Sequence, residues 1–425
     1  MEKHEICKLI IQQIQSYLSS PDCLEAHREK NHFVRKRKLS MSHIVTYLLY
    51  TSRASMNTNI DQIREVLPQI AFPEVSKQAV SKARQYINPS LFSELFNLSV
   101  DSFYRNLDSR KTWHGYHIYA VDGSRLEIPN SRSTFDFFGE MFTYPHKDRK
   151  FTSGLASIIY DVLEDYIVHA SLARYLASER TAAIRHMETL TELNLYENSV
   201  IIFDRGYYSD EMFRYCVTHG HLCLMRIKEA VKLSKSCHGD TICSLSDGTS
   251  EDNDVKVRVI EVLLDDGSKE YLATNLFDKS ITKEMFRELY FLRWPVEVKY
   301  FELKERFRLE EYNGTTATSV IQEFYINILL SNLTALIKAK VDDDINIALS
   351  TSRSKHRYQA NRTFIIGKIR ILLAKLINGI LNPEAIDSLV KACFKVRSQI
   401  QPGRKFRRKR KLVCRKHFPN IKSAY

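Results

Sequence analysis

Four side chains near residue 300 have the types and the spacing that phosphate chemistry requires. In chain order they are Tyr290, Arg293, Glu297 and Lys304, and the last three follow the first at offsets of 3, 7 and 14 residues. A helix turns by about 100° per residue, so these offsets would place all four side chains within roughly 60° of one another. A carboxylate can hold a metal ion while neighbouring cations and a phenol grip phosphate oxygens. The pattern therefore indicates the cutting or joining of a nucleic-acid strand.

Pro295 falls inside this pattern and limits where the helix can run. Proline has no backbone N–H to donate, and it disfavours helical geometry at the residue before it, here Trp294. We therefore predict that Pro295 is the first residue of the helix. Glu297 and Lys304 would then share one face of it, and the two upstream members of the pattern would lie on the turn that leads in.

Two upstream aspartates supply the further carboxylates that such a site needs. Asp122 follows the strand-like segment HIYAV and precedes Gly123, and Asp204 follows the apolar run SVIIF. A continuous apolar run of that length favours a buried strand whose end presents the acid. Mg²⁺ prefers carboxylate oxygens, and two or three acids suffice to hold it. A single aspartate at a strand end is more often a turn residue, so the prediction depends on Asp122, Asp204 and Glu297 converging at one point.

These motifs carry a resemblance to a known family. Residues 289–304, LYFLRWPVEVKYFELK, look like the YREK signature of DDE transposases of the insertion-sequence type-four family. The DGS motif at 122–124, the DRG motif at 204–206 and the LATNL segment at 272–276 are similar to that family as well. The resemblance extends from about residue 30 to the C-terminus. It implies an enzyme that cleaves the ends of an insertion element and joins them to target DNA, using Mg²⁺, for which Mn²⁺ could substitute, within a homodimer that holds two DNA ends.

The resemblance also assigns roles to individual residues. Asp122, Asp204 and Glu297 would be the catalytic residues and the metal ligands. The cations and the phenol of the signature, Tyr290, Arg293 and Lys304, would hold the phosphates of the DNA end. Trp294 is a candidate for stacking on a flipped-out base, but buried packing is the favoured interpretation for this residue. Arg205 and Ser124 are further candidates for DNA contact because each lies beside one of the aspartates.

The order of the expected elements predicts an α/β fold with a ribonuclease-H-like core. A strand ending at Asp122 is followed by a hairpin with strands at Ala156–Tyr160 and Tyr166–Ala170, a helix from Glu179, the strand ending at Asp204, a further helix and a further strand. Alternating, turn-punctuated segments after Ala230 predict a β-rich insertion. The predicted divisions are 1–110, a helical region that binds the DNA end; 111–229, the first part of the core; 230–280, the insertion; 281–345, the second part of the core; and 346–425, a helical region with a basic tail.

The charge of the chain is concentrated at its C-terminal end. The 425 residues carry a formal net charge of +13, and residues 401–425 contain ten Lys or Arg and no acid, so the other residues carry only +3. A tail of this kind is typical of a nucleic-acid arm. We therefore predict DNA contacts from Arg404, Lys405, Arg407 and Arg408. The tail lacks the amphipathic apolar face that binding to a membrane surface requires.

Composition and cysteine spacing favour a cytoplasmic protein that is not associated with a membrane, and the resemblance implies a bacterial protein that acts at the nucleoid. The longest apolar stretch, Phe324–Ile337, is shorter than the ~18 residues that span a bilayer, and the start of the chain does not read as a secretory signal. The eight cysteines form no CxxC pair, which suits reduced thiols. A zinc site at Cys237, His238 and Cys243 is disfavoured by its spacing. Two helical segments within Asp61–Ile87 resemble a helix-turn-helix.

Two alternatives to an active transposase remain open from the sequence. The first is a metal-dependent DNA nuclease of the same ribonuclease-H-like fold that does not transfer strands. The second is an inactive DNA-binding derivative in which only the basic surfaces matter. The intact four-residue signature speaks against the second.

Overall fold

The computed structural model describes residues 1–401 apart from 36, 143–149, 247–253, 265–266 and 352–355. The chain forms two compact units, each assembled from separate segments. Unit 1 comprises Met1–Asp108, Leu126–Gly154 and Leu303–Tyr425, and unit 2 comprises Ser109–Arg125 and Leu155–Glu302.

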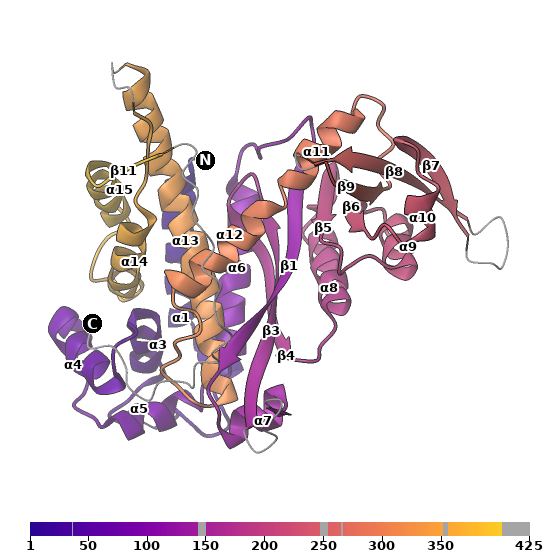
Figure 1. Ribbon diagram of the computed structural model, residues 1–425. Helices are drawn as coiled ribbons and strands as arrows, with labels where there is room; N and C mark the ends of the chain where they lie inside the picture. The colour runs from indigo at the N-terminus through magenta and orange to yellow at the C-terminus, as the bar shows by residue number, and fades with distance from the viewer. Residues whose placement is uncertain (36, 143–149, 247–253, 265–266, 352–355, 402–425) are drawn as a thin grey trace. The chain divides into compact units, whose positions relative to one another are not determined.

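Unit 2 is organised around a mixed sheet (Figure 1). Its first five strands in chain order are β1 (His117–Ile128), β3 (Lys150–Asp161), β4 (Tyr166–Arg174), β5 (Ser199–Phe203) and β6 (Leu222–Ile227). They lie side by side in the order β4-β3-β1-β5-β6, and β1, β5 and β6 are mutually parallel. A hairpin on one side of the first strand and two parallel strands on the other is the arrangement of a ribonuclease-H-like core. The predicted fold class is confirmed.

The helices of this core begin where the sequence supplies caps. Helix α8 (Glu179–Glu192) follows β4, and α9 (Asp210–Thr218) follows β5. The side chains of Ser178 and Ser209 accept hydrogen bonds from the backbone N–H groups of Thr181 and Met212, which satisfies donors that a helix start leaves open. All five residues of β5 are buried, as expected for a central strand covered on both faces.

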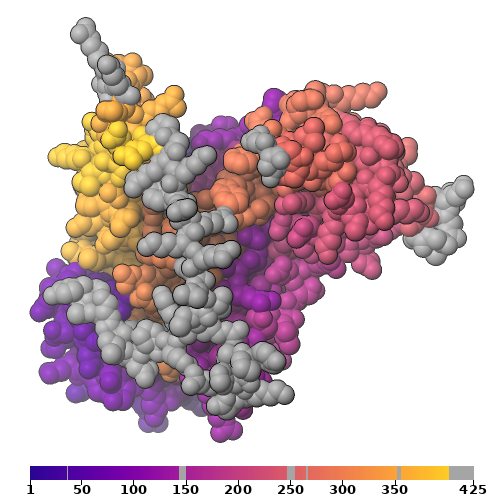
Figure 2. Space-filling model, viewed as in Figure 1, coloured from indigo at the N-terminus to yellow at the C-terminus, as the bar shows by residue number. Residues whose placement is uncertain are grey.

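Residues 230–280 extend the core sheet. They form α10 (Lys232–Lys235), β7 (Asp240–Leu245), β8 (Val255–Leu263) and β9 (Lys269–Thr274), and β9 pairs antiparallel with β6. Apolar side chains of these strands, among them Ile260 and Leu272, share one buried cluster with Val200 of β5 and Leu289 of α11 (Lys283–Phe291). In the space-filling view these strands form a continuous surface with the neighbouring segments of unit 2 (Figure 2). The core therefore fixes α11, which carries Tyr290.

Unit 1 is mainly helical. Its helices are α1 (Lys3–Ser19), α2 (Pro21–His27), α3 (Met41–Tyr50), α4 (Met56–Val66), the short η1 (Pro68–Ile70), α5 (Lys77–Arg84), α6 (Ser90–Asn106), α7 (Arg132–Phe138), α13 (Ala317–Ser350), α14 (Arg362–Ile377) and α15 (Ala385–Lys395). Short strands β2 (Met141–Phe142), β10 (Tyr358–Gln359) and β11 (Ser398–Gln399) complete it. The connection between α4 and α5, residues 67–76, is longer than the three or four residues of a helix-turn-helix, so the resemblance to that motif was wrong.

Helix α13 is the central element of unit 1 and packs against α1, α6, α14 and α15. By length and composition it could cross a bilayer, but 89% of its most apolar window is buried inside the protein, which is the pattern of a core helix. Arg84 of α5 is fully buried and donates hydrogen bonds to Gln322 and Glu323 of α13, each at 3.0 Å. Arg53 pairs with the same Glu323 at 3.3 Å. Such pairs fix one helix against another, because losing one partner would leave a buried charge uncompensated.

Two histidines form a buried pair in unit 2. His186 of α8 lies with its Nδ1 2.7 Å from Nδ1 of His169 on β4 and its Nε2 2.9 Å from the hydroxyl of Ser157 on β3. One shared proton serves the two Nδ1 atoms, so both rings are neutral in this arrangement. Burial lowers the pKa of both histidines, that of His169 to about 4, and the charge of Arg185 lowers the pKa of His169 further.

We predict that this pair makes the protein sensitive to acid. The ordinary histidine pKa is 6.5 and the folded value for His169 is about 4, so the contribution to stability is complete above pH 6.5 and is lost as the pH falls toward 4. The lost free energy is at most roughly 3 kcal/mol. Urea denaturation from pH 7.5 to pH 4 should show a steeper loss of stability in the parent protein than in His169→Gln.

Both proteins in that comparison should carry Asp122→Asn. Burial raises the pKa of Asp122 to about 7, so its protonation stabilises the folded state as the pH falls from about 7 toward 3.8 and opposes the histidine effect. Identical pH slopes with and without His169 would show that the pair does not titrate as described.

Candidate active site

Asp122 and Asp204 occupy matching positions on adjacent parallel strands. Asp204 directly follows β5, but Asp122 lies inside β1, which continues to Ile128, so the prediction that the first strand ends at Asp122 was wrong. The register of β1 and β5 pairs Val121 with Phe203, and each aspartate is the next residue along the chain. Neighbouring strands lie about 4.8 Å apart, so the two carboxylates emerge side by side. Both side chains are half-buried.

Glu297 comes from the first turn of α12 (Trp294–Glu305). Helix α11 ends at Phe291, and Arg293 lies in the turn between the two helices. The prediction that Pro295 opens the helix was wrong by one residue, since α12 begins at Trp294. Proline is tolerated there because the first N–H groups of a helix have no intrahelical partner.

Charge and hydrogen bonds connect these acids to the neighbouring cation and phenol. Arg293 donates to Glu297 Oε1 at 2.6 Å, and the hydroxyl of Tyr290 donates to Asp204 Oδ1 at 3.3 Å. Burial raises the pKa of Asp122 to about 7; the Gly123 N–H and the positive charge of Arg293 oppose the shift, and the charges of Glu297 and Asp204 add to it. The electrostatic coupling shows that five of the predicted residues form one cluster in unit 2.

The cluster is not yet closed around a single point. Within the described residues, the three carboxylates do not all come within 4.8 Å of one another. Glu297 instead holds the guanidinium of Arg293, so a cationic group already neutralises one of the three acids. Half-buried carboxylates with hard oxygen donors are nevertheless the set that Mg²⁺ or Mn²⁺ prefers, and the residues present fit such an ion.

The remaining predicted residues either adjoin the aspartates in sequence or make other contacts. Lys304 lies near the end of α12, in unit 1, where its ammonium is 3.2 Å from Glu310. Arg205 is exposed and Ser124 half-buried, each next to its aspartate. Trp294 is 42% exposed, so the interpretation that it is packed in the interior was wrong. The tail residues Arg404, Lys405, Arg407 and Arg408 lie outside the described part of the chain.

Helix α8 contributes two residues that the sequence did not single out for the site. Arg180 donates hydrogen bonds to the backbone carbonyls of Tyr207 at 3.1 Å and Tyr208 at 2.9 Å, so it holds the loop that follows Asp204. The carboxylate of Glu179 lies 3.3 Å from the position that a Cβ atom would take at residue 123, so this acid approaches the backbone beside Asp122 closely. The sequence pattern predicts where α8 begins, but it does not predict which loops the first residues of the helix contact.

A cavity of about 480 Å³ opens beside Tyr290 and Arg293. It is lined by cations, by aromatic rings and by one acid: Arg226, Arg287, Arg293, Tyr290, Phe291, Trp294 and Glu270, together with aliphatic side chains of β8 and β9. Arg226 pairs with Glu270 at 2.9 Å. Cations next to exposed aromatic rings suit a ligand that has both phosphates and bases.

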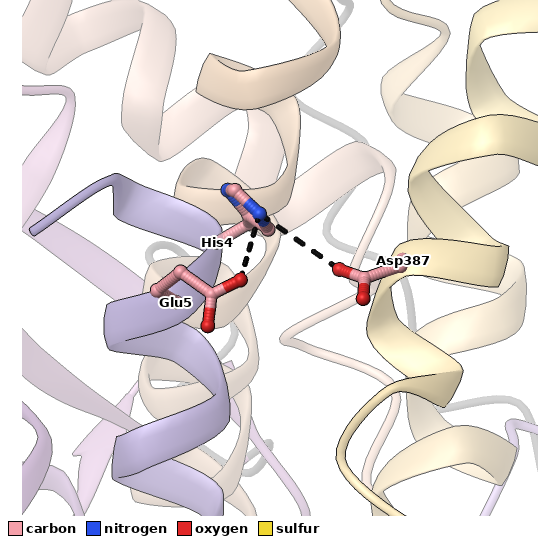
Figure 3. Close-up of side chains that lie close together, drawn as sticks. All are labelled: His4, Glu5 and Asp387. Atoms are coloured by element: carbon pink, nitrogen blue, oxygen red, sulfur yellow. Dashed lines mark ion pairs between the residues drawn. The ribbon is translucent and has the colours of Figure 1, made fainter.

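A second acidic cluster lies in unit 1 and is already neutralised. His4 and Glu5 of α1 and Asp387 of α15 point toward one another (Figure 3). The ammonium of Lys8 lies 2.7 Å from Glu5 and 2.8 Å from Asp387, so it supplies the positive charge that these acids require. We interpret the cluster as a tie between two helices. In the described part of the chain this is the one group of His, Cys, Asp or Glu residues with metal-binding spacing.

Comparisons with known proteins agree with one another. A family model described as "Transposase DDE domain" matches residues 113–333. A "Putative transposase InsZ" from Escherichia coli (strain K12) is 21% identical over 138 residues, which cover 32% of this chain and 44% of that protein. A "Probable transposase for insertion sequence element IS5377" from Geobacillus stearothermophilus is 24% identical over 183 residues, covering 40% and 48% of the two chains. The chain thus spans about half the length of the curated relatives it matches.

One solved structure is similar over most of its length. It is titled "Cryo-EM structure of piggyBac transposase synaptic complex with hairpin DNA (SNHP)" and has a TM-score of 0.48 at 10% identity, covering 93% of this chain and 84% of that one.

We predict that Arg293 competes with a divalent cation for Glu297. Arg293→Gln should bind Mn²⁺ about fivefold more tightly than the parent protein without DNA, because the carboxylate no longer has to leave a half-buried ion pair worth roughly 1 kcal/mol. Electron paramagnetic resonance of free Mn²⁺ measures this affinity. Arg205→Gln is the matched control, since it removes an exposed cation beside Asp204. Equal affinities of the two variants would mean that only overall charge matters.

Proposed function

The chain belongs to the transposase DDE domain family, and from this membership we propose that it is a DNA transposase that cleaves the ends of an insertion element and joins them to target DNA. The observation that carries the proposal is the register of β1 and β5, which brings Asp122 and Asp204 side by side within electrostatic reach of Glu297. The spacing of Tyr290, Arg293, Glu297 and Lys304 supports assignment to the insertion-sequence type-four family.

In this proposal Asp122, Asp204 and Glu297 hold Mg²⁺, for which Mn²⁺ could substitute. When bound, divalent ions polarise a phosphodiester and stabilise the charge that develops during its hydrolysis or transesterification. The residues of the chain bind the DNA end and orient it. Tyr290 and Arg293 donate hydrogen bonds, now made to carboxylates, and they would turn to the phosphate oxygens of a bound DNA end. Such charge-assisted contacts are strong and directional.

Away from the three carboxylates, the cations of unit 2 and of the C-terminal tail would make further contacts to DNA. The cavity beside Tyr290 has three guanidinium groups for phosphates and the rings of Phe291 and Trp294 for bases. Arg205 and Lys304 would add contacts to the same DNA. The tail cations Arg404, Lys405, Arg407 and Arg408 would bind phosphates regardless of sequence. We further propose that two copies of the chain hold two DNA ends and act at the bacterial nucleoid.

Purified protein, paired-end DNA and Mg²⁺ test the proposal directly. Strand-transfer products on a gel are the expected result. Cleavage without joining would indicate the nuclease of the same fold, and binding without cleavage would indicate an inactive DNA-binding derivative.

We predict that Asp204→Asn lowers end cleavage by a factor of about 1000 or more, because the loss of one ligand removes several kcal/mol of charge stabilisation. Its affinity for terminal DNA should stay within about twofold of the parent value, measured by fluorescence anisotropy. Asp210→Asn is the control, since Asp210 is exposed and its carboxylate accepts from Tyr208. Cleavage at the parental rate in Asp204→Asn would remove this residue from the active site.

A further inference from the structure

Helix α12 is held in unit 2 by an unusual set of inward-facing side chains. Between Trp294 and Glu302 these include Val296, Lys299 and Tyr300, all of which are buried. Two of the three are polar. Buried polar groups hydrogen-bond in fixed directions, whereas apolar contacts allow a helix to slide or rotate by small amounts.

The hydroxyl of Tyr300 connects α12 to two strands at once. Its oxygen lies 3.1 Å from the carbonyl oxygen of Asp122 on β1 and 2.9 Å from that of Ala156 on β3. A phenol has one proton to donate, so the two carbonyls share it. The contact on β1 is made to the backbone of Asp122 itself. Glu297 lies three residues earlier on the same helix, about 4.5 Å along its axis.

Lys299 supplies a second polar anchor. Its ammonium lies 2.8 Å from Asp165 in the turn between β3 and β4 and 3.6 Å from Glu302 on its own helix. It also lies 5.4 Å from the ring centroid of Tyr160, whose hydroxyl donates to the same Asp165. The second anchor is thus on the hairpin, and the first is on the strand that carries Asp122.

We propose that Tyr300, with Lys299 as the second anchor, positions Glu297 against Asp122 and thereby sets the affinity of the three carboxylates for a divalent ion. The inference rests on the proposed function, which assigns these carboxylates to an ion. The pair between Glu297 and Arg293 does not join α12 to the sheet, because Arg293 is only four residues before Glu297, in the turn that leads into the same helix.

Tyr300→Phe tests the proposal because it keeps the ring and removes only the hydroxyl. We expect Mn²⁺ affinity to fall about tenfold, as for other groups that orient metal ligands. The Mg²⁺ concentration for half-maximal DNA cleavage should rise in parallel, and saturating Mg²⁺ should restore most of the rate. A tyrosine that only stabilises the fold would lower the melting temperature without this shift in ion dependence.

Tyr119→Phe is the matched control. Tyr119 is buried on the same strand, three residues before Asp122, and its hydroxyl accepts a hydrogen bond from Arg110 at 2.7 Å. Tyr119→Phe removes the same hydroxyl oxygen as Tyr300→Phe, but the partner that it loses, Arg110, is not on α12. Unchanged Mn²⁺ affinity in folded Tyr300→Phe, or an equal loss in both variants, would overturn the proposal.

Asp165→Asn tests the second anchor from the protein surface, where misfolding is less of a risk because the Asp165 side chain is 24% exposed. It should weaken Mn²⁺ binding as well, by about threefold, and unchanged binding would count against the proposal even if Tyr300→Phe did not fold.

Asp204→Asn distinguishes a failure of this proposal from a failure of the proposed function. If Asp204→Asn and the anchor variants all bind Mn²⁺ like the parent, the carboxylates are not an ion site and the proposed function fails with the inference. If only Asp204→Asn weakens binding, the anchors are not positioning residues.

Discussion

The parallel pairing of β1 with β5 is the constraint on which the rest of the site depends. Parallel strands in register bring successive residues to the same level, so the alignment of Val121 with Phe203 brings the following aspartates together. A slip of one residue would turn one carboxylate to the opposite face. Parallel strands need a crossover and cover on both faces. The hairpin and α8 form the crossover from β1 to β5, α9 forms the crossover from β5 to β6, and the buried side chains of β5 hold the register.

The convergence of acids has an electrostatic cost that the chain offsets with its own groups. Like charges and burial raise the pKa of Asp122 to about 7, and Arg293 opposes this shift while pairing with Glu297. A dication at the acids and a phosphate at Arg293 would each replace one half of that ion pair. The two ligands therefore stabilise each other's binding by the reciprocity that governs linked sites. The two binding events are linked because the same residue, Arg293, can pair either with Glu297 or with a phosphate.

The local patterns of the sequence predicted the fold and the buried strand that precedes Asp204, because an apolar run followed by an acid is typical of such a strand end. They did not predict that β1 continues past Asp122. Other details depend on tertiary contacts that local patterns do not contain. The exposure of Trp294 and the pairing of Lys304 with Glu310 depend on partners distant from the helical pattern. Residues 230–280 were expected as an insertion, and only the pairing of β9 with β6 shows that they continue the core sheet.

Tyr300 and Lys299 show why the sequence alone could not complete the site. Their partners lie at residues 122, 156 and 165, and no periodicity within α12 distinguishes a tyrosine that binds two carbonyls from one that fills space. The helix needs such contacts because its catalytic face and its packing face lie within one turn of each other. An error of about 1 Å in the placement of a ligand changes what a hard cation can bind, since its bonds to oxygen tolerate only a few tenths of an ångström. Directional anchors on the strand that carries Asp122 therefore do more for the ion site than an equal area of apolar contact could.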